Sequence, residues 1–190
     1  MHRQSGVRAR RLRGLSAVLR TAETVSSMHA INQRAAKVLA QLVAGLRLGD
    51  RTSARTIGGP RGGAIMPVSV ECIGADLFSV AHYYEQNGDL MADPEMVFWR
   101  RGAAFYPVHF QQDNLGIYRE CLWFDDAGGP ARVAPKEQRD QAAFAGTWMR
   151  NIRAQQREWF AAVAAFTQHA ANDPHCTCAD CMDRFSQEDQ

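Results

Sequence analysis

The sequence contains no long apolar run. Although 46% of its 190 residues are hydrophobic, no segment approaches the roughly 20 apolar residues of a membrane-spanning helix. The basic N-terminus also has no apolar core of about 7–15 residues, which a secretory signal requires. We therefore expect a soluble, cytoplasmic protein that has no membrane partner and whose thiols stay reduced.

Motifs of the common nucleotide-binding and acyl-transfer sites are also absent. The Gly-rich stretch 58–63 does not match G-x-x-x-x-G-K-[ST], and no G-x-S-x-G marks a nucleophilic serine. Eight acidic or imidazole side chains do occur in the middle of the chain: His82, Glu85, Asp89, Asp93, Glu95, His109, Asp113 and Glu120. A metal-dependent hydrolase or nuclease needs about three of them at one point. We keep this enzyme as the alternative function, with the first four of these residues as its site, and otherwise interpret the set as turn-forming and surface groups.

Cysteine is scarce except in one C-terminal segment, His175-Cys176-Thr177-Cys178-Ala179-Asp180-Cys181, which holds three of the five cysteines. Thiolate and imidazole are the ligands that Zn²⁺ prefers, and a structural site has about four of them. We predict that Cys176, Cys178 and Cys181 bind zinc and order a metal-binding tail over residues 171–190.

The fourth zinc ligand stays open, because no second C-x-x-C or H-x-x-x-H closes the set. The candidates are His169, His175, Asp180, Asp183 or a cysteine of a second copy. The alternative to a metal site is an exposed, redox-sensitive tail. The other two cysteines, Cys72 and Cys121, fall in predicted strands, where we expect small buried apolar residues.

Acidic residues are absent before Glu23, whereas six arginines precede it. We predict a disordered basic tail over residues 1–27. Guanidinium groups match phosphate geometry, so we expect nucleic-acid contacts from four of them: Arg8, Arg10, Arg11 and Arg13. The alternatives are a solvated extension without a partner, a transit peptide, and upstream sequence translated before a start at Met28.

Residues 28–170 are predicted to form one α+β domain. Apolar residues recur every three or four positions from Ile31 to Leu46, which indicates an N-terminal helix capped by Ser26 or Ser27, and residues 50–63 read as a loop. The period changes to two between Ile65 and Phe124. We predict a five-stranded antiparallel meander there, with strands near 66–73, 78–85, 95–101, 105–111 and 117–124 and an Asn-Gly hairpin after the second.

A long helix is predicted over residues 136–170, with an apolar stripe from Phe144 to Phe166. Such a helix is about 50 Å long, so we expect its second half to pack elsewhere or to break off. Its Ala-rich stretch 161–165 allows close approach of a second copy and hence a homodimer. Arg150, Arg153 and Arg157 share a face of this helix, which is either a nucleic-acid contact or a solvated surface.

The block Ser79–Met96, which contains HYYEQNGDLMADPEM, resembles an uncharacterised bacterial domain family. Tyr106-Pro107-Val108 and the segment Gln112–Tyr118 carry the same resemblance, which spans about Met28–Arg157. Members of that family occur on plasmids, integrative conjugative elements and phages. The resemblance implies an accessory protein of mobile DNA and no established activity.

The leading interpretation is a non-enzymatic accessory protein of a mobile genetic element that binds nucleic acid or a host protein. An inhibitor of a host defence system fits the same setting, without support from particular residues.

Overall fold

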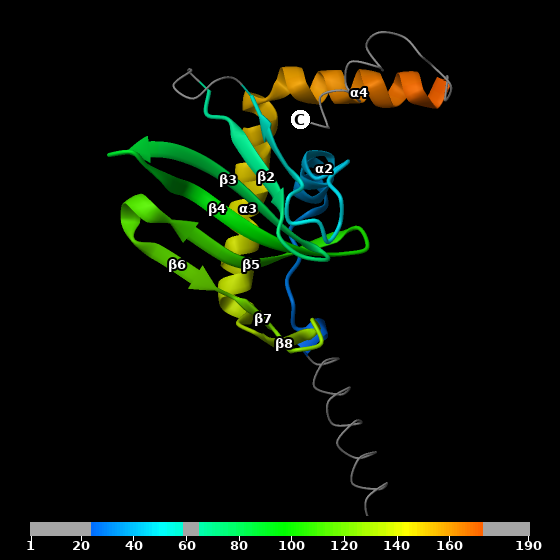
Figure 1. Cartoon of the computed structure of the whole chain (residues 1–190). Coiled ribbons are helices and arrows are strands. Elements are labelled where there is room, and N and C mark those ends of the chain that lie inside the picture. The colour runs from blue at the N-terminus through cyan, green and yellow to red at the C-terminus, as the bar shows by residue number, and fades with distance from the viewer. Residues whose placement is uncertain (1–23, 59–64, 173–190) are drawn as a thin grey trace, which may run out of the picture.

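The computed structural model describes residues 24–58 and 65–172, with side chains to residue 165. Its centre is a six-stranded antiparallel sheet with the strand order β1-β2-β3-β4-β5-β6. Helices α2 and α3 pack on one face of this sheet (Figure 1). None of the described helices has the length and apolar character that crossing a membrane requires. The consecutive strand order and the two helices on the sheet confirm the predicted α+β class and antiparallel meander.

The sheet has six strands rather than the five that the sequence predicted. The strands are β1 (Ala54–Ile57), β2 (Val68–Cys72), β3 (Leu77–Gln86), β4 (Asp89–Arg101), β5 (Ala104–Gln112) and β6 (Ile117–Glu120). Strand β1 falls in the segment that was predicted to be a loop, because it is only four residues long and Ile57 is its one buried side chain.

The prediction of one strand over residues 117–124 was also wrong, because the structure has two separate strands there. It divides after Glu120, where the Cys121 amide donates to the Val108 carbonyl and the Cys121 carbonyl accepts from Ala134. The following residues form β7 (Leu122–Phe124), which pairs with β8 (Pro130–Val133) in a separate ribbon.

The turn between β3 and β4 is the predicted Asn-Gly hairpin. Asn87 and Gly88 both have positive φ, 56° and 87°, as a two-residue turn between twisted strands requires. A short 3₁₀ turn, η1 (Asp113–Leu115), joins β5 to β6.

The hydrophobic core lies between the sheet and the two helices. On the sheet side it contains Phe78, Val80, Met96 and Phe98, all fully buried. Helix α2 (Gln33–Leu42) contributes Ala35, Val38, Leu39 and Leu42, and helix α3 (Pro135–Gln155) contributes Ala145, Met149 and Ile152. Full burial of each large side chain contributes about 1.5–3 kcal/mol.

Helix α2 is shorter than the predicted 28–46, and neither Ser26 nor Ser27 is its cap. Asn32 is the N-cap, and its side chain accepts a hydrogen bond from the Ala35 amide. The preceding residues are held by other elements instead, because the Ile31 amide donates to Phe105 and the His29 amide to the Gln138 side chain.

The predicted long helix breaks into two at Gln156. This residue is buried, and its Nε2 donates to the Met66 carbonyl at 3.0 Å. Gln155, the residue before the break, is exposed. Helix α4 (Arg157–Asn172) then runs away from the axis of α3 at the top of the molecule in Figure 1. The break agrees with the expectation that one straight helix would extend past the sheet.

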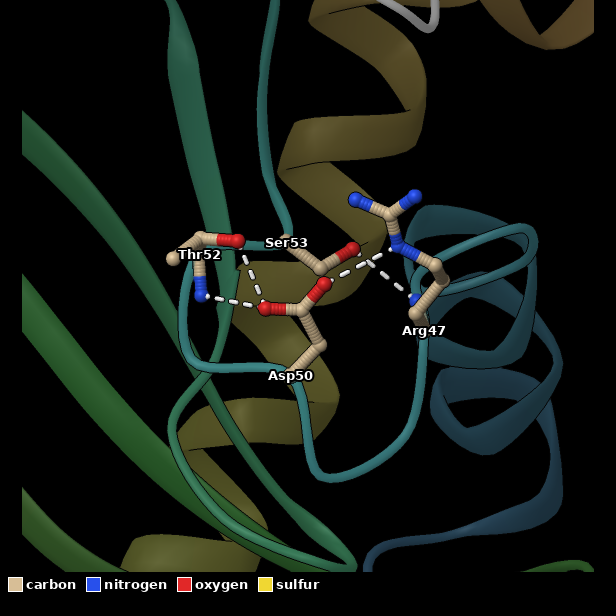
Figure 2. A network of polar contacts seen from close by, with 4 residues as sticks. All are labelled: Arg47, Asp50, Thr52 and Ser53. Carbon is tan, nitrogen blue, oxygen red and sulfur yellow. Dashed lines mark hydrogen bonds and ion pairs between the residues drawn. The ribbon is translucent and has the colours of Figure 1, made fainter.

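A polar network fixes the loop between α2 and β1 (Figure 2). The Asp50 carboxylate accepts hydrogen bonds from the Thr52 hydroxyl and amide and from Arg47 Nε. The Thr52 hydroxyl, more than the other groups, lowers the pKa of Asp50. The Arg47 amide donates to Ser53 Oγ at 2.9 Å, so both ends of the loop are joined just before β1 begins.

Candidate functional site

Two predicted sites lie outside the described residues: the zinc site with His175, Cys176, Cys178 and Cys181, and the arginine set Arg8, Arg10, Arg11 and Arg13. The backbone of His169 belongs to α4, but its side chain is outside the described ones. Zinc and the tail contacts therefore stay predictions.

The three helix arginines are exposed around the junction of α3 and α4. Arg150 and Arg153 lie on α3, whereas the break at Gln156 places Arg157 on α4. The Arg153 guanidinium carbon is 5.8 Å from the centre of the Phe160 ring. The predicted single helical face is thus divided, although all three side chains remain open to solvent.

The residues of the alternative hydrolase site do not meet at one point. His82 is in the core, with Nδ1 2.9 Å from the Pro67 carbonyl oxygen and its ring edge-on to Trp148. Glu85 and Asp89 are exposed near the β3–β4 turn, and Asp93 accepts hydrogen bonds from amide side chains near η1. In the described parts of the chain, no three His, Cys, Asp or Glu are grouped so that they could hold a metal ion.

The opposite face of the sheet is different, because no described helix covers it (Figure 1). The strand register places polar and aromatic side chains there in adjacent rows. We call this surface the open face, and it consists of Ser69, Glu71, Ser79, Ala81, Tyr83, Glu95, Val97, Trp99, Tyr106, His109, Gln111, Tyr118 and Glu120.

Glu95 on β4 is the central acid of the open face. Its Oε1 accepts a hydrogen bond of 2.6 Å from Ser79 Oγ, and the Tyr83 hydroxyl is its second partner. Burial, followed by the negative charges of Glu95 and Glu71, raises the pKa of Tyr83 to about 12. Tyr83 is therefore a neutral hydrogen-bond donor at physiological pH and not a general base.

Glu120 on β6 lies directly across from His109 on β5. Its carboxylate accepts hydrogen bonds from the Tyr118 hydroxyl at 3.2 Å and from Trp123 Nε1 at 2.9 Å. Burial lowers the pKa of His109, and the charges of Glu95 and Glu120 only partly oppose this effect. His109 is consequently neutral at pH 7 and does not balance the charge of its acidic neighbours.

The open face therefore carries uncompensated negative charge. Glu71, Glu95 and Glu120 have no ion-pair partner among the described residues. The hydrogen bonds that Glu95 and Glu120 accept come from neutral hydroxyl and indole groups. Such donors hold a carboxylate in place without neutralising it.

Aromatic rings border one end of the open face. The Trp99 ring centre is 5.9 Å from that of Tyr106 and 5.6 Å from that of Phe124. The Arg101 guanidinium lies 5.9 Å from the Trp99 ring centre. This end combines large apolar area with faces that attract cations.

The cysteines of the described residues are not nucleophiles. The Cys121 thiol is fully buried and donates to the Pro107 carbonyl at 3.1 Å and to the Gln141 side chain at 3.2 Å. Burial, more than the nearby Glu137 and Glu120, raises its pKa to about 12. Cys72 is also buried. The expectation of buried cysteines is confirmed, and burial keeps both thiols away from a substrate in solution.

Glu95, His109 and Glu120 are all among the eight acidic and imidazole candidates of the sequence, but their spacing does not show that they lie together. The alternation within each strand could have indicated this surface, because the residues between the buried apolar ones all point to the opposite face of the sheet. Which of them are neighbours depends on register, and both β3–β4 and β4–β5 contain an irregularity.

No curated protein and no solved structure is significantly similar to the chain. One family model does match, over residues 37–157, and this match includes the whole six-stranded sheet and α3. The chain therefore belongs to the family described as domain of unknown function DUF6908.

Proposed function

We propose that this chain is a non-enzymatic binding protein and that its open face recognises a protein partner. The observation that carries the proposal is a sheet face without a described helix on it, on which the half-buried Glu71 and Glu95 and the exposed Glu120 lie among aromatic rings. Tyrosine and tryptophan are enriched where proteins meet their partners.

The packing of the open face supports a preformed surface. Ser79, Ala81 and Val97 at its centre are at most 3% exposed, although no described helix lies over them. They are small side chains among larger ones such as Tyr83, Glu95 and His109. A surface that is already packed loses little conformational entropy when a partner binds.

The charge of the open face favours protein over nucleic acid as its ligand. Three carboxylates that have no ion-pair partner among the described residues repel phosphate groups, whereas nucleic-acid sites need cations. The described residues give catalysis no support, because His82, Glu85, Asp89 and Asp93 do not meet at one point and no three metal-ligating side chains are grouped there.

The test uses affinity purification from source cells with the wild type and two variants. The first variant carries Trp99→Ala and Tyr106→Ala, which remove two rings of the open face. The second carries Arg150→Gln and Arg153→Gln, which change two exposed residues of α3. We expect a partner that the first variant loses and the second retains. A partner retained by the open-face variant at wild-type yield would contradict the proposal, provided that both variants unfold at the wild-type temperature.

Nucleic-acid binding is a second candidate, supported by the exposed Arg150, Arg153 and Arg157 at the α3–α4 junction. Gel-shift titrations at two salt concentrations should show weaker binding at high salt. Replacing these three arginines by glutamine should weaken binding to all sequences and reduce the salt dependence. The matched control is glutamine at Arg34, Lys37 and Arg51, which are exposed on α2 and the loop after it. Absence of binding to single- and double-stranded DNA and to RNA would remove this candidate.

The accessory role in mobile DNA and the cytoplasmic location are parts of the same proposal. They are supported by the resemblance of the Ser79–Met96 block to proteins of plasmids, integrative elements and phages. The genes that flank the coding sequence test this setting, and a chromosomal neighbourhood of housekeeping genes would count against it.

A further inference from the structure

We infer that the partner segment bound by the open face is basic and extended, and that its lysine or arginine side chains neutralise Glu71, Glu95 and Glu120. This inference rests on the proposed function and specifies the chemistry of the partner. It follows from three features of the described residues: the unbalanced charge, the spacing of the acids, and the aromatic border.

Two of the three acids accept hydrogen bonds from neutral side chains of the open face and its border. Ser79 and Tyr83 orient the Glu95 carboxylate, and Tyr118 and Trp123 orient that of Glu120. All four donors are neutral, so the negative charge remains available to a ligand. Charge complementarity of this kind selects partners and accelerates their association.

The spacing of the acids fits an extended segment. Glu71 on β2 and Glu120 on β6 lie in one row, which also contains Ser79, Val97 and His109. Four strand steps of about 4.8 Å separate the two ends of that row, or about 19 Å in total. Glu95 is in the next row, on the central strand β4. A segment of about six extended residues spans this distance.

The aromatic border shows which cation it accepts. The chain's own Arg101 guanidinium lies over Trp99, and that of Arg132 lies 3.6 Å from the centre of the Trp123 ring. Trp123 also donates to Glu120. These rings stack guanidinium groups beside carboxylates that have no ion-pair partner in the described part of the chain. The same chemistry favours arginine in the partner.

The test measures binding of an acetylated, amidated six-arginine peptide to the full chain by isothermal titration calorimetry. The test variant carries Glu71→Gln, Glu95→Gln and Glu120→Gln, and glutamine keeps a side-chain oxygen for Ser79 and Tyr118. The matched control removes three exposed acids elsewhere, through Asp126→Asn, Asp140→Asn and Glu158→Gln. Circular dichroism and thermal unfolding verify that both variants fold.

We expect the peptide to bind the wild type and the control with similar affinity. The open-face variant should bind at least about tenfold more weakly, because each lost charge pair removes a favourable contact. Equal affinity of the two variants would mean general attraction to an acidic protein and would overturn the inference. Comparable binding of a six-glutamate peptide would overturn it as well.

A further variant examines the chain's own arginines, with glutamine at Arg8, Arg10, Arg11 and Arg13. If the peptide binds only after this change, the occupant of the open face is the chain's own basic segment, and the assignment to a partner is wrong. The inference and the proposed function can fail separately. A cellular partner that depends on Trp99 and Tyr106, without any affinity for the peptide, would retain the proposed function and reject a basic segment.

Discussion

The side chain of His82 is buried in the core. Its imidazole is 6% exposed, donates from Nδ1 to the Pro67 carbonyl and packs edge-on against Trp148 at a distance of 5.6 Å between ring centres. Burial lowers the pKa of His82, and the Pro67 carbonyl and Asp93 oppose the effect only in part. A protonated imidazole would place a charge in the core, so the neutral form is favoured in the folded state.

This burial predicts acid sensitivity. The lowered pKa means that the unfolded chain binds more protons than the folded chain below the ordinary value of 6.5. The free energy of unfolding should therefore fall as pH decreases from about 7 through the folded pKa, by at most about 1.4 kcal/mol per pH unit for one group. Urea denaturation at several pH values measures the slope.

A His82→Gln variant should show a smaller slope over that range. Glutamine keeps a donor for the Pro67 carbonyl but does not titrate. His109 also has a lowered pKa, so His109→Gln provides the comparison and should remove the rest of the effect. An unchanged slope in both variants would show that other groups control the acid sensitivity.

At the scale of elements, α2 and α3 meet at a glycine. A Cβ on Gly146 of α3 would lie 2.5 Å from Nδ2 of Asn32, the N-cap of α2. The absence of a side chain thus allows the capped end of one helix to approach the other. Glycine inside a helix costs about 1 kcal/mol relative to alanine, so this contact offsets a local penalty.

A double-mutant cycle tests the contact between α2 and α3. Gly146→Ala alone should give no stabilisation, because the gain in helix propensity is cancelled when Asn32 is displaced and its cap, worth about 0.5–2 kcal/mol, is weakened. In an Asn32→Ala background the same change should stabilise the protein by about 1 kcal/mol. Thermal unfolding of the four proteins gives the coupling energy. A coupling near zero would mean that the helices adjust without cost.

The formal net charge of the whole molecule is only +2, because acidic and basic regions of its sequence nearly cancel. The open face is acidic, whereas exposed arginines gather at the α3–α4 junction. Six further arginines precede Glu23 in the sequence. A molecule with surfaces of opposite charge can bind two partners of different chemistry without competition between them.

The zinc site predicted at Cys176, Cys178 and Cys181 can be tested through the metal content of the protein. Purified protein should contain about one zinc per chain, measured by elemental analysis, and Cys176→Ser, Cys178→Ser and Cys181→Ser should each reduce the content strongly. Cys72→Ser is the control and should retain the metal, because Cys72 is buried in the core. Wild-type protein without metal, after purification free of chelators, would favour the redox-sensitive tail.

Much of the fold follows from local pattern alone. The two-residue period from Val68 to Phe110 and the Asn87-Gly88 turn determined the antiparallel meander, since alternation and turn chemistry act between near neighbours. The burial of Cys72 and Cys121 was predicted from their positions in the expected strands. The edge strand β1 and the division after Glu120 could not be predicted, because both depend on hydrogen bonds to distant segments.

The sequence by itself determined which residues are polar and which face of each strand they occupy. Only the tertiary structure decided that Glu71, Glu95 and Glu120 share one surface, which no described helix covers, while His82 points into the core. The physical reason is that strand register and the side on which helices pack are set by contacts far apart in the chain. A one-residue change of register would turn each side chain to the other face.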